Sequence, residues 1–177
     1  MSKIFLIAGL GADTRIYNNI DLGDNEVIPV DWIEPHKTDT LTTYSQKLIH
    51  QYFITDNSIV IGTSLGGMLA IEIAKQVRLN KVILISSIKT VHEAPAYFKF
   101  FKAVPVQQFV KWAMDAVLAW KNEVIPANVY HIVGDSDHVF NYKRINNAMV
   151  IKGGTHIMVF NKAKEINKLL KGILKKK

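Results

Sequence analysis

One short stretch of this chain has the residue types and the spacing of a chemical site. Gly62-Thr63-Ser64-Leu65-Gly66 follows the apolar run Ile59–Ile61 and precedes a segment with helical patterning. G-x-S-x-G is the pattern of a nucleophile elbow, a sharp strand-to-helix turn that lifts a serine hydroxyl clear of the backbone. Residues two before and two after the serine approach so closely that glycine is required, which explains Gly62 and Gly66. Ser64 is therefore a candidate nucleophile that needs a base, an orienting acid and oxyanion donors from elsewhere in the chain.

Three further groups suited to the same chemistry also stand directly after apolar runs. In an open parallel sheet the ligand site lies at the carboxyl ends of the strands, so groups in these positions are expected to converge on Ser64. In chain order they are the glycine loop Gly9-Leu10-Gly11 and the loops that contain Asp137 and His156.

The elements that must position these groups alternate between short apolar runs and segments of helical periodicity. This alternation predicts an α/β fold: a doubly wound, about six-stranded, mostly parallel sheet with helices on both faces and a minimal cap. Pro29 suggests an edge or irregular position for the second strand. The predicted strands are Ile4–Ala8, Val27–Val30, Ser58–Ile61, Lys81–Ile85, Val129–Val133 and Ala148–Ile151.

Helical segments are predicted between these strands, and no linker, repeat or low-complexity tract interrupts them. Residues 1–177 are therefore expected to form a single domain. Thr40 or Asp39 can cap the helix that begins near Leu41, and Asn161 can cap the last helix. The other predicted helical segments are Thr14–Ile20, Leu65–Val77 and Ile88–Asn122, the last divided by Pro95 and Pro105.

The composition is that of a globular protein and excludes several kinds of site. Apolar residues make up 49% of the chain, and the absence of cysteine excludes disulfides and thiolate metal sites. The histidines other than His156 show no metal-ligand spacing. The run Ile4–Ala8 is too short for a signal peptide, and no stretch reaches the length of a membrane span. We therefore expect a soluble, cytoplasmic protein without stable membrane insertion.

The formal net charge of +7 is concentrated at the C-terminal end of the chain. From Lys162 onward there are seven lysines against the single acidic residue Glu165. A nucleic-acid surface usually runs across a fold and interleaves aromatic residues, which this terminal segment does not. We interpret it as a solvated helix face with a solubilising end and expect no nucleic-acid partner; binding to an anionic partner is the alternative.

Taken together, these motifs resemble the α/β-hydrolase superfamily, in particular its small carboxylesterase-like serine hydrolases. The resemblance covers essentially the whole chain, because the order Ser, Asp, His and the preceding strands all match. It implies that Ser64 is the nucleophile, His156 the general base and Asp137 the acid that orients the imidazole. It also implies that the amides of Leu10 and Leu65 form the oxyanion hole. A small-molecule ester is the implied substrate, with no metal or organic cofactor.

Three departures from the family pattern are visible. Ala8 stands where many members have histidine, although the oxyanion donor is the later backbone amide. Asp135 competes with Asp137 for the role of the acid; the family pattern places the acid three residues after Gly134 and so favours Asp137. The chain also lacks the leading antiparallel strands and a long lid, which leaves a short helical cap segment around residues 88–105.

Two other functional classes remain open from the sequence. Gly9-Leu10-Gly11 followed by Asp31 mimics a Rossmann nucleotide-binding fingerprint, although Thr14 occupies its third glycine position. A catalytically inactive member of the fold could instead act as a small-molecule receptor or interaction module. Within the hydrolase interpretation, thioester hydrolysis, C–N bond cleavage and cyanohydrin-type lyase activity use the same machinery and are not separated from ester hydrolysis.

Overall fold

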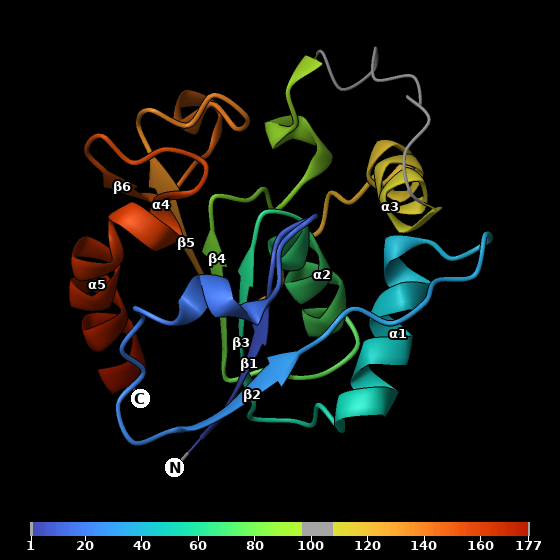
Figure 1. Cartoon of the computed structure of the whole chain (residues 1–177), viewed down its shortest axis with the longest axis horizontal. Helices are drawn as coiled ribbons and strands as arrows, with labels where there is room; N and C mark the ends of the chain where they lie inside the picture. The colour runs from blue at the N-terminus through green and yellow to red at the C-terminus, as the bar shows by residue number, and fades with distance from the viewer. Residues whose placement is uncertain (1, 97–107, 177) are drawn as a thin grey trace.

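A computed structural model, which describes residues 2–96 and 108–176, contains one six-stranded parallel sheet with helices on both faces (Figure 1). The strand order is β2-β1-β3-β4-β5-β6, and every neighbouring pair is parallel. The predicted fold class is confirmed. The strands are β1 (Lys3–Ile7), β2 (Glu26–Val30), β3 (Ile59–Thr63), β4 (Lys81–Ile85), β5 (Val129–Gly134) and β6 (Met149–Ile151).

The strand order reverses direction between β1 and β3. The chain first moves outward from β1 to β2, which forms the sheet edge as Pro29 indicates, and then returns to place β3 on the other side of β1. Ile7 pairs with Gly62 in the register of β1 and β3, so the loops after both strands emerge side by side. Ligands of open α/β sheets bind at such a switch point.

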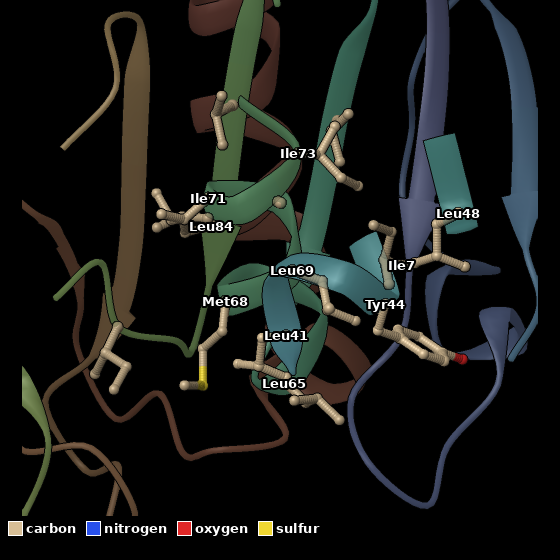
Figure 2. Close-up of a cluster of buried hydrophobic side chains, with 14 of the residues drawn as sticks. Ile7, Leu41, Tyr44, Leu48, Leu65, Met68, Leu69, Ile71, Ile73 and Leu84 are labelled. Carbon is tan, nitrogen blue, oxygen red and sulfur yellow. The ribbon is translucent and has the colours of Figure 1, made fainter. Parts of the chain in front are cut away.

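Strand side chains alternate between two cores, one on each face of the sheet. Phe5 and Ile7 face the core under α1 (Leu41–Tyr52), α2 (Leu65–Ala74) and α3 (Gln108–Ala119). Figure 2 shows Ile7 beside the apolar side chains of α1 and α2 in this core. Ile4 and Leu6 face the opposite core, under η1 (Thr14–Tyr17), α4 (Met158–Asn161) and α5 (Ala163–Lys175). The described residues also form the short helices η2 (Val91–Glu93) and η4 (Tyr142–Arg144).

The observed helix limits correct several predicted ones. The segment predicted over Thr14–Ile20 is only a single 3-10 turn, and α2 ends three residues before the predicted Val77. Asn161 does not cap the last helix; it is the last residue of α4, whose turn closes when the Lys162 amide donates to the Met158 carbonyl (2.8 Å). Thr40, rather than Asp39, caps α1 through a capping box with Thr43.

The predicted cap segment around residues 88–105 lies partly outside the described residues. Its described part contains η2, and α3 begins at Gln108.

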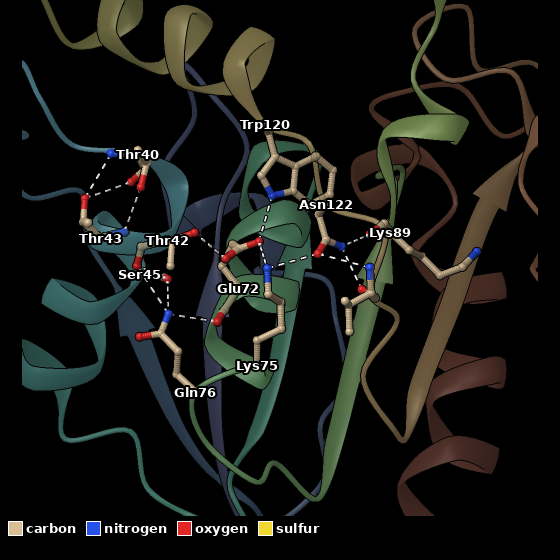
Figure 3. A network of polar contacts seen from close by, with 11 residues as sticks. Thr40, Thr42, Thr43, Ser45, Glu72, Lys75, Gln76, Lys89, Trp120 and Asn122 are labelled. Atoms are coloured by element: carbon tan, nitrogen blue, oxygen red, sulfur yellow. Dashed lines mark hydrogen bonds and ion pairs between the residues drawn. The ribbon is translucent and has the colours of Figure 1, made fainter.

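A buried polar network ties α1, α2 and the segment after α3 together (Figure 3). The fully buried Glu72 carboxylate of α2 accepts hydrogen bonds from Thr42, Lys75 and Trp120 at 2.7–2.8 Å. Asn122 then accepts from Lys75 (3.0 Å) and donates to the Lys89 carbonyl (2.8 Å). Because a buried carboxylate is costly without partners, this network fixes how α2 and the end of α3 lie relative to each other.

Candidate active site

Ser64 occupies the turn between β3 and α2 with a strained backbone. Its φ of 53° and ψ of −118° lie outside the regions that L-residues ordinarily adopt. A Cβ on Gly62 would lie 2.2 Å from the Gly66 carbonyl oxygen, and one on Gly66 would lie 2.3 Å from the Ile7 carbonyl oxygen. Side chains at either glycine would therefore force β1, β3 and α2 apart.

Two side chains that the sequence did not single out hold this turn in place. Ser87, the second residue after β4, donates its hydroxyl to the Ser64 carbonyl oxygen (2.6 Å). Tyr17 donates to the Ile7 carbonyl (2.8 Å) and lies 2.8 Å from the Thr63 hydroxyl, which links η1 to the ends of β1 and β3. Burial raises the pKa of the Tyr17 phenol, so it stays neutral as a hydrogen-bond donor. Neither residue belongs to a recognisable local motif.

The structure brings Ser64, His156 and Asp137 into one hydrogen-bonded chain. His156 Nε2 lies 3.0 Å from Ser64 Oγ, and His156 Nδ1 lies 3.0 Å from Asp137 Oδ2 and 3.2 Å from Oδ1. With Nδ1–H donating to the carboxylate, Nε2 is left as the acceptor for the serine hydroxyl. The Phe140 ring packs edge-on against the imidazole with centroids 5.4 Å apart, which limits its rotation.

Asp137 is held as a buried carboxylate. Its side chain is 1% exposed, and its Oδ1 accepts the backbone amides of Val139 (2.8 Å) and Phe140 (2.9 Å). Burial alone would raise the pKa of Asp137, but the hydrogen bonds from His156 and these two amides outweigh it and hold the pKa below the ordinary value. The sequence analysis missed the two amides, although an aspartate that accepts amides two and three residues later is a common turn signature.

The competing acid, Asp135, belongs to a different group of hydrogen bonds. Its Oδ1 accepts the Gly153 amide (2.7 Å) and the Ser136 hydroxyl (2.9 Å), so it fastens the loop after β6 to the loop after β5. The same two loops touch at Gly134 and Gly154, where a Cβ on Gly134 would lie 2.0 Å from the Gly154 carbonyl oxygen. This contact lets the loops of Asp137 and His156 meet.

The two predicted oxyanion donors lie beside Ser64. Leu65 is the first residue of α2, so its amide is one of those that helix geometry leaves without an intrahelical acceptor. The loop of Leu10 runs against Ser64, since a Cβ on Gly9 would lie 3.2 Å from the Ser64 Cβ. Leu10, Ser64 and Leu65 line the same cavity.

That cavity has a volume of about 240 Å³, and among the described residues that line it Ser64 alone is polar. The other described residues that line it belong to α2, α3 and the loop after β5: Met68, Ala113, Met114, Val117, Leu118, Val139 and Phe140. Such a wall suits an uncharged, hydrophobic part of a small molecule.

A buried cluster of charged and polar side chains lies next to the segment that follows β4. Lys89 donates to Glu93 (2.5 Å), to the Asn146 carbonyl (2.9 Å) and to His131 Nδ1 (3.3 Å). His131 in turn donates through Nε2 to the Ser87 carbonyl (2.9 Å). Burial, together with the charge of Lys89, lowers the pKa of His131 to about 3, so the ring is neutral near neutral pH. The cluster thus anchors the residue whose hydroxyl holds Ser64.

The nucleotide-binding interpretation does not fit the loop after β1. A dinucleotide site needs a helix whose N-terminal amides follow the glycine loop directly and receive the pyrophosphate. After Gly9-Leu10-Gly11 the chain forms only the 3-10 turn η1, and that turn is used to hold the elbow through Tyr17.

Across residues 2–96 and 108–176, no three histidine, aspartate or glutamate side chains gather closely enough to hold a metal ion. In the same part of the chain, no helix has both the length and the apolar character needed to cross a membrane.

Comparison with solved structures places the chain in the α/β-hydrolase fold. An esterase from Thermogutta terrifontis superposes with a TM-score of 0.68 at 14% identity, over 98% of this chain and 89% of the esterase. A mutant epoxide hydrolase from Bacillus megaterium gives a TM-score of 0.73 at 12% identity, over 99% and 94%. An alpha/beta hydrolase from a lagoon-sediment metagenome gives 0.71 at 18% identity, over 98% and 90%. No protein-family model and no curated protein sequence matches the chain.

Proposed function

We propose that this protein is a serine hydrolase that cleaves carboxylic esters through an acyl-Ser64 intermediate. The observation that carries the proposal is the continuous hydrogen-bonded chain from the buried Asp137 carboxylate through His156 to a hydroxyl on a strained turn. Strain of this kind is retained where it serves a site. The adjacent apolar cavity supplies room for a substrate.

In the first half-reaction Ser64 Oγ attacks the ester carbonyl carbon while its proton passes to His156 Nε2. The carbonyl oxygen becomes an oxyanion that accepts the amide hydrogens of Leu65 and Leu10. Asp137 stabilises the imidazolium, which then gives its proton to the departing alkoxide. The alcohol leaves and the acyl group stays bound to Ser64.

In the second half-reaction water replaces the alcohol. His156 Nε2 takes a proton from the water as its oxygen attacks the acyl carbon, and returns the proton to Ser64 Oγ as the carboxylic acid departs. A thioester follows the same steps with a thiolate as the leaving group. Esters are proposed because the solved structures that share this fold include an esterase.

Covalent labelling tests the proposal directly. A fluorophosphonate should form one adduct, located at Ser64 by mass spectrometry of peptides, and the Ser64→Ala variant should form none. Ser136→Ala is the matched control, because the Ser136 hydroxyl contacts Asp135 and not His156. A folded wild-type protein that remains unlabelled, or that is labelled equally after Ser64→Ala, would refute the proposal.

A further inference from the structure

The orientation of one proposed oxyanion donor is set by a single peptide group. The N–H of Leu65 belongs to the same peptide group as the carbonyl of Ser64, and this peptide bond is trans. In a trans peptide group the carbonyl and the N–H lie in one plane and point in opposite directions. Whatever holds the Ser64 carbonyl therefore also decides where the Leu65 N–H points.

Three donors hold the Ser64 carbonyl oxygen. The amides of Gly67 (2.9 Å) and Met68 (3.3 Å) come from the first turn of α2, and the hydroxyl of Ser87 donates at 2.6 Å. Among the described residues, the Ser87 hydroxyl is the only partner of this carbonyl from outside α2, and its bond is the shortest of the three. It ties the peptide group to the segment after β4, so the N–H of Leu65 points away from that segment.

The Ser87 hydroxyl is itself fixed by its surroundings. The residue is fully buried, and a Cβ on Gly67 would lie 2.4 Å from its Oγ, so the hydroxyl is in direct contact with the first turn of α2. The backbone carbonyl of Ser87 accepts a hydrogen bond from His131 Nε2 (2.9 Å) on the neighbouring strand β5. The hydroxyl therefore reaches Ser64 from a rigid base.

The other proposed donor is oriented by a bond within its own loop. The N–H of Leu10 shares its peptide group with the carbonyl of Gly9, which accepts the amide of Ala12 (3.1 Å). The peptide group of Leu65 instead follows a strained residue, because the φ of 53° and ψ of −118° at Ser64 persist only where the surroundings impose them. Rotation about the Cα–C bond of Ser64, which ψ measures, would swing the Leu65 N–H away from its present direction.

We infer that Ser87 is a positioning residue that aims the Leu65 N–H at the oxyanion formed during catalysis. This inference rests on the proposed ester hydrolysis. The hydrogen bond from the Ser87 hydroxyl also polarises the peptide group, which strengthens its N–H as a donor. The oxyanion is absent from the bound substrate, so loss of this alignment lowers kcat and leaves substrate binding unchanged. Both half-reactions pass through an oxyanion, so both slow down together.

Steady-state hydrolysis of p-nitrophenyl butyrate by Ser87→Ala tests the inference. Its kcat should fall about five- to hundredfold while KM stays within about threefold, which is less than the loss of about 10²–10³ on removal of a whole oxyanion donor. The matched control is Ser86→Ala. Ser86 is adjacent and equally buried, and its hydroxyl has no hydrogen-bond partner among the described residues. This variant should keep kcat and KM within about twofold, because it removes no hydrogen bond.

Three further measurements separate positioning from a general disturbance of the site. A trifluoromethyl ketone adds to Ser64 as a tetrahedral adduct with an oxyanion, so its inhibition constant should rise in Ser87→Ala by the factor by which kcat/KM falls. The pH of half-maximal kcat/KM should move by less than about 0.3, because in the described part of the chain Ser87 has no hydrogen bond to His156 or Asp137. Ser87→Cys, whose thiol is a weaker donor, should have a kcat between those of wild type and Ser87→Ala.

The possible failures are distinguishable. A folded Ser87→Ala that keeps more than about a fifth of the wild-type kcat, or that loses activity through KM alone, overturns the inference and leaves ester hydrolysis intact. An unchanged inhibition constant of the trifluoromethyl ketone, or an equal loss in Ser86→Ala, overturns it as well. Where thermal melts show that Ser87→Ala does not fold, a wild-type kcat in Ser87→Cys overturns the inference. Absence of turnover and of fluorophosphonate labelling in the wild type overturns the proposed function and this inference with it.

Discussion

Replacement of Asp137 by asparagine should slow ester hydrolysis by about 10⁴ while the protein stays folded. Asparagine has nearly the same shape, and its side-chain oxygen can still accept the Val139 and Phe140 amides that Oδ1 accepts now. The loop after β5 should therefore keep its conformation. What changes is the group that faces His156 Nδ1, 3.0 Å away.

The magnitude follows from the tautomer of the imidazole. The asparagine NH₂ would donate to Nδ1, which must then be unprotonated, so the ring proton moves to Nε2. Nε2 lies 3.0 Å from Ser64 Oγ and could no longer accept the serine proton. The same substitution in the triad of a serine protease lowers kcat by about 10⁴, which corresponds to about 5.5 kcal/mol of activation free energy.

Steady-state hydrolysis of p-nitrophenyl butyrate measures this loss, and fluorophosphonate labelling rates should fall in parallel. Asp135→Asn is the control: Asp135 accepts the Gly153 amide rather than His156, so the variant should keep kcat within about tenfold. The reasoning is refuted if folded Asp137→Asn keeps more than a tenth of the activity. It is equally refuted if Asp135→Asn loses more than Asp137→Asn.

The same variant has a predicted signature in stability. Because the folded-state pKa of Asp137 lies below the ordinary 3.8, its charge contributes stability above pH 3.8 that is lost as the pH falls through the lower folded value. The contribution of the Asp137 charge to the difference in free energy of unfolding between wild type and Asp137→Asn should therefore be constant from pH 5 to 7. It should shrink only below about pH 4. Urea titrations at several pH values measure it; a difference that grows on acidification would contradict the assignment.

Three further variants probe the framework around the site. Gly62→Ala places a Cβ 2.2 Å from the Gly66 carbonyl oxygen. It should lower the free energy of unfolding by about 3 kcal/mol or more and abolish fluorophosphonate labelling. A variant with the wild-type urea midpoint would show instead that the elbow can relax. Glu93→Gln leaves the buried Lys89 ammonium without its counter-charge and should lower the free energy of unfolding in urea by about 3–5 kcal/mol. Adding Lys89→Met to this variant should restore part of the lost free energy. An equal loss in the single and the double variant would argue against an ionic role. The pKa of His131 is about 3 in the folded protein, below its ordinary 6.5, so the unfolded chain binds more protons and the free energy of unfolding falls as the pH drops below 6.5. Between pH 6.5 and 5 the wild-type protein should lose about 2 kcal/mol more of this free energy than His131→Gln does. Identical pH dependences of the two proteins would contradict this prediction.

Elements were predictable wherever local physics decides them. The segment Lys81–Ile85 predicted a strand because its last four residues are all apolar, as a strand buried on both faces requires, and the structure has β4 at those residues. The lower accuracy for helices has a local reason too. Asn161 is a favourable cap by type, but the turn of α4 already includes it, and nothing in the neighbouring residues signals a four-residue helix directly before α5.

The order of the parts can be read from the chain alone: an elbow whose Gly62 is required by its contact with Gly66, and an aspartate and a histidine after successive strands. Because the strands are parallel, their carboxyl ends share one edge, so the meeting of these groups was predictable as well. Which side chains support these groups depends instead on contacts between segments that are far apart in the chain. Ser87 reaches Ser64 across 23 residues and Tyr17 reaches Thr63 across 46, and no local pattern encodes such contacts. The cavity beside Ser64 is likewise a product of packing, because its shape depends on how α3 lies over α2 and not on any one segment.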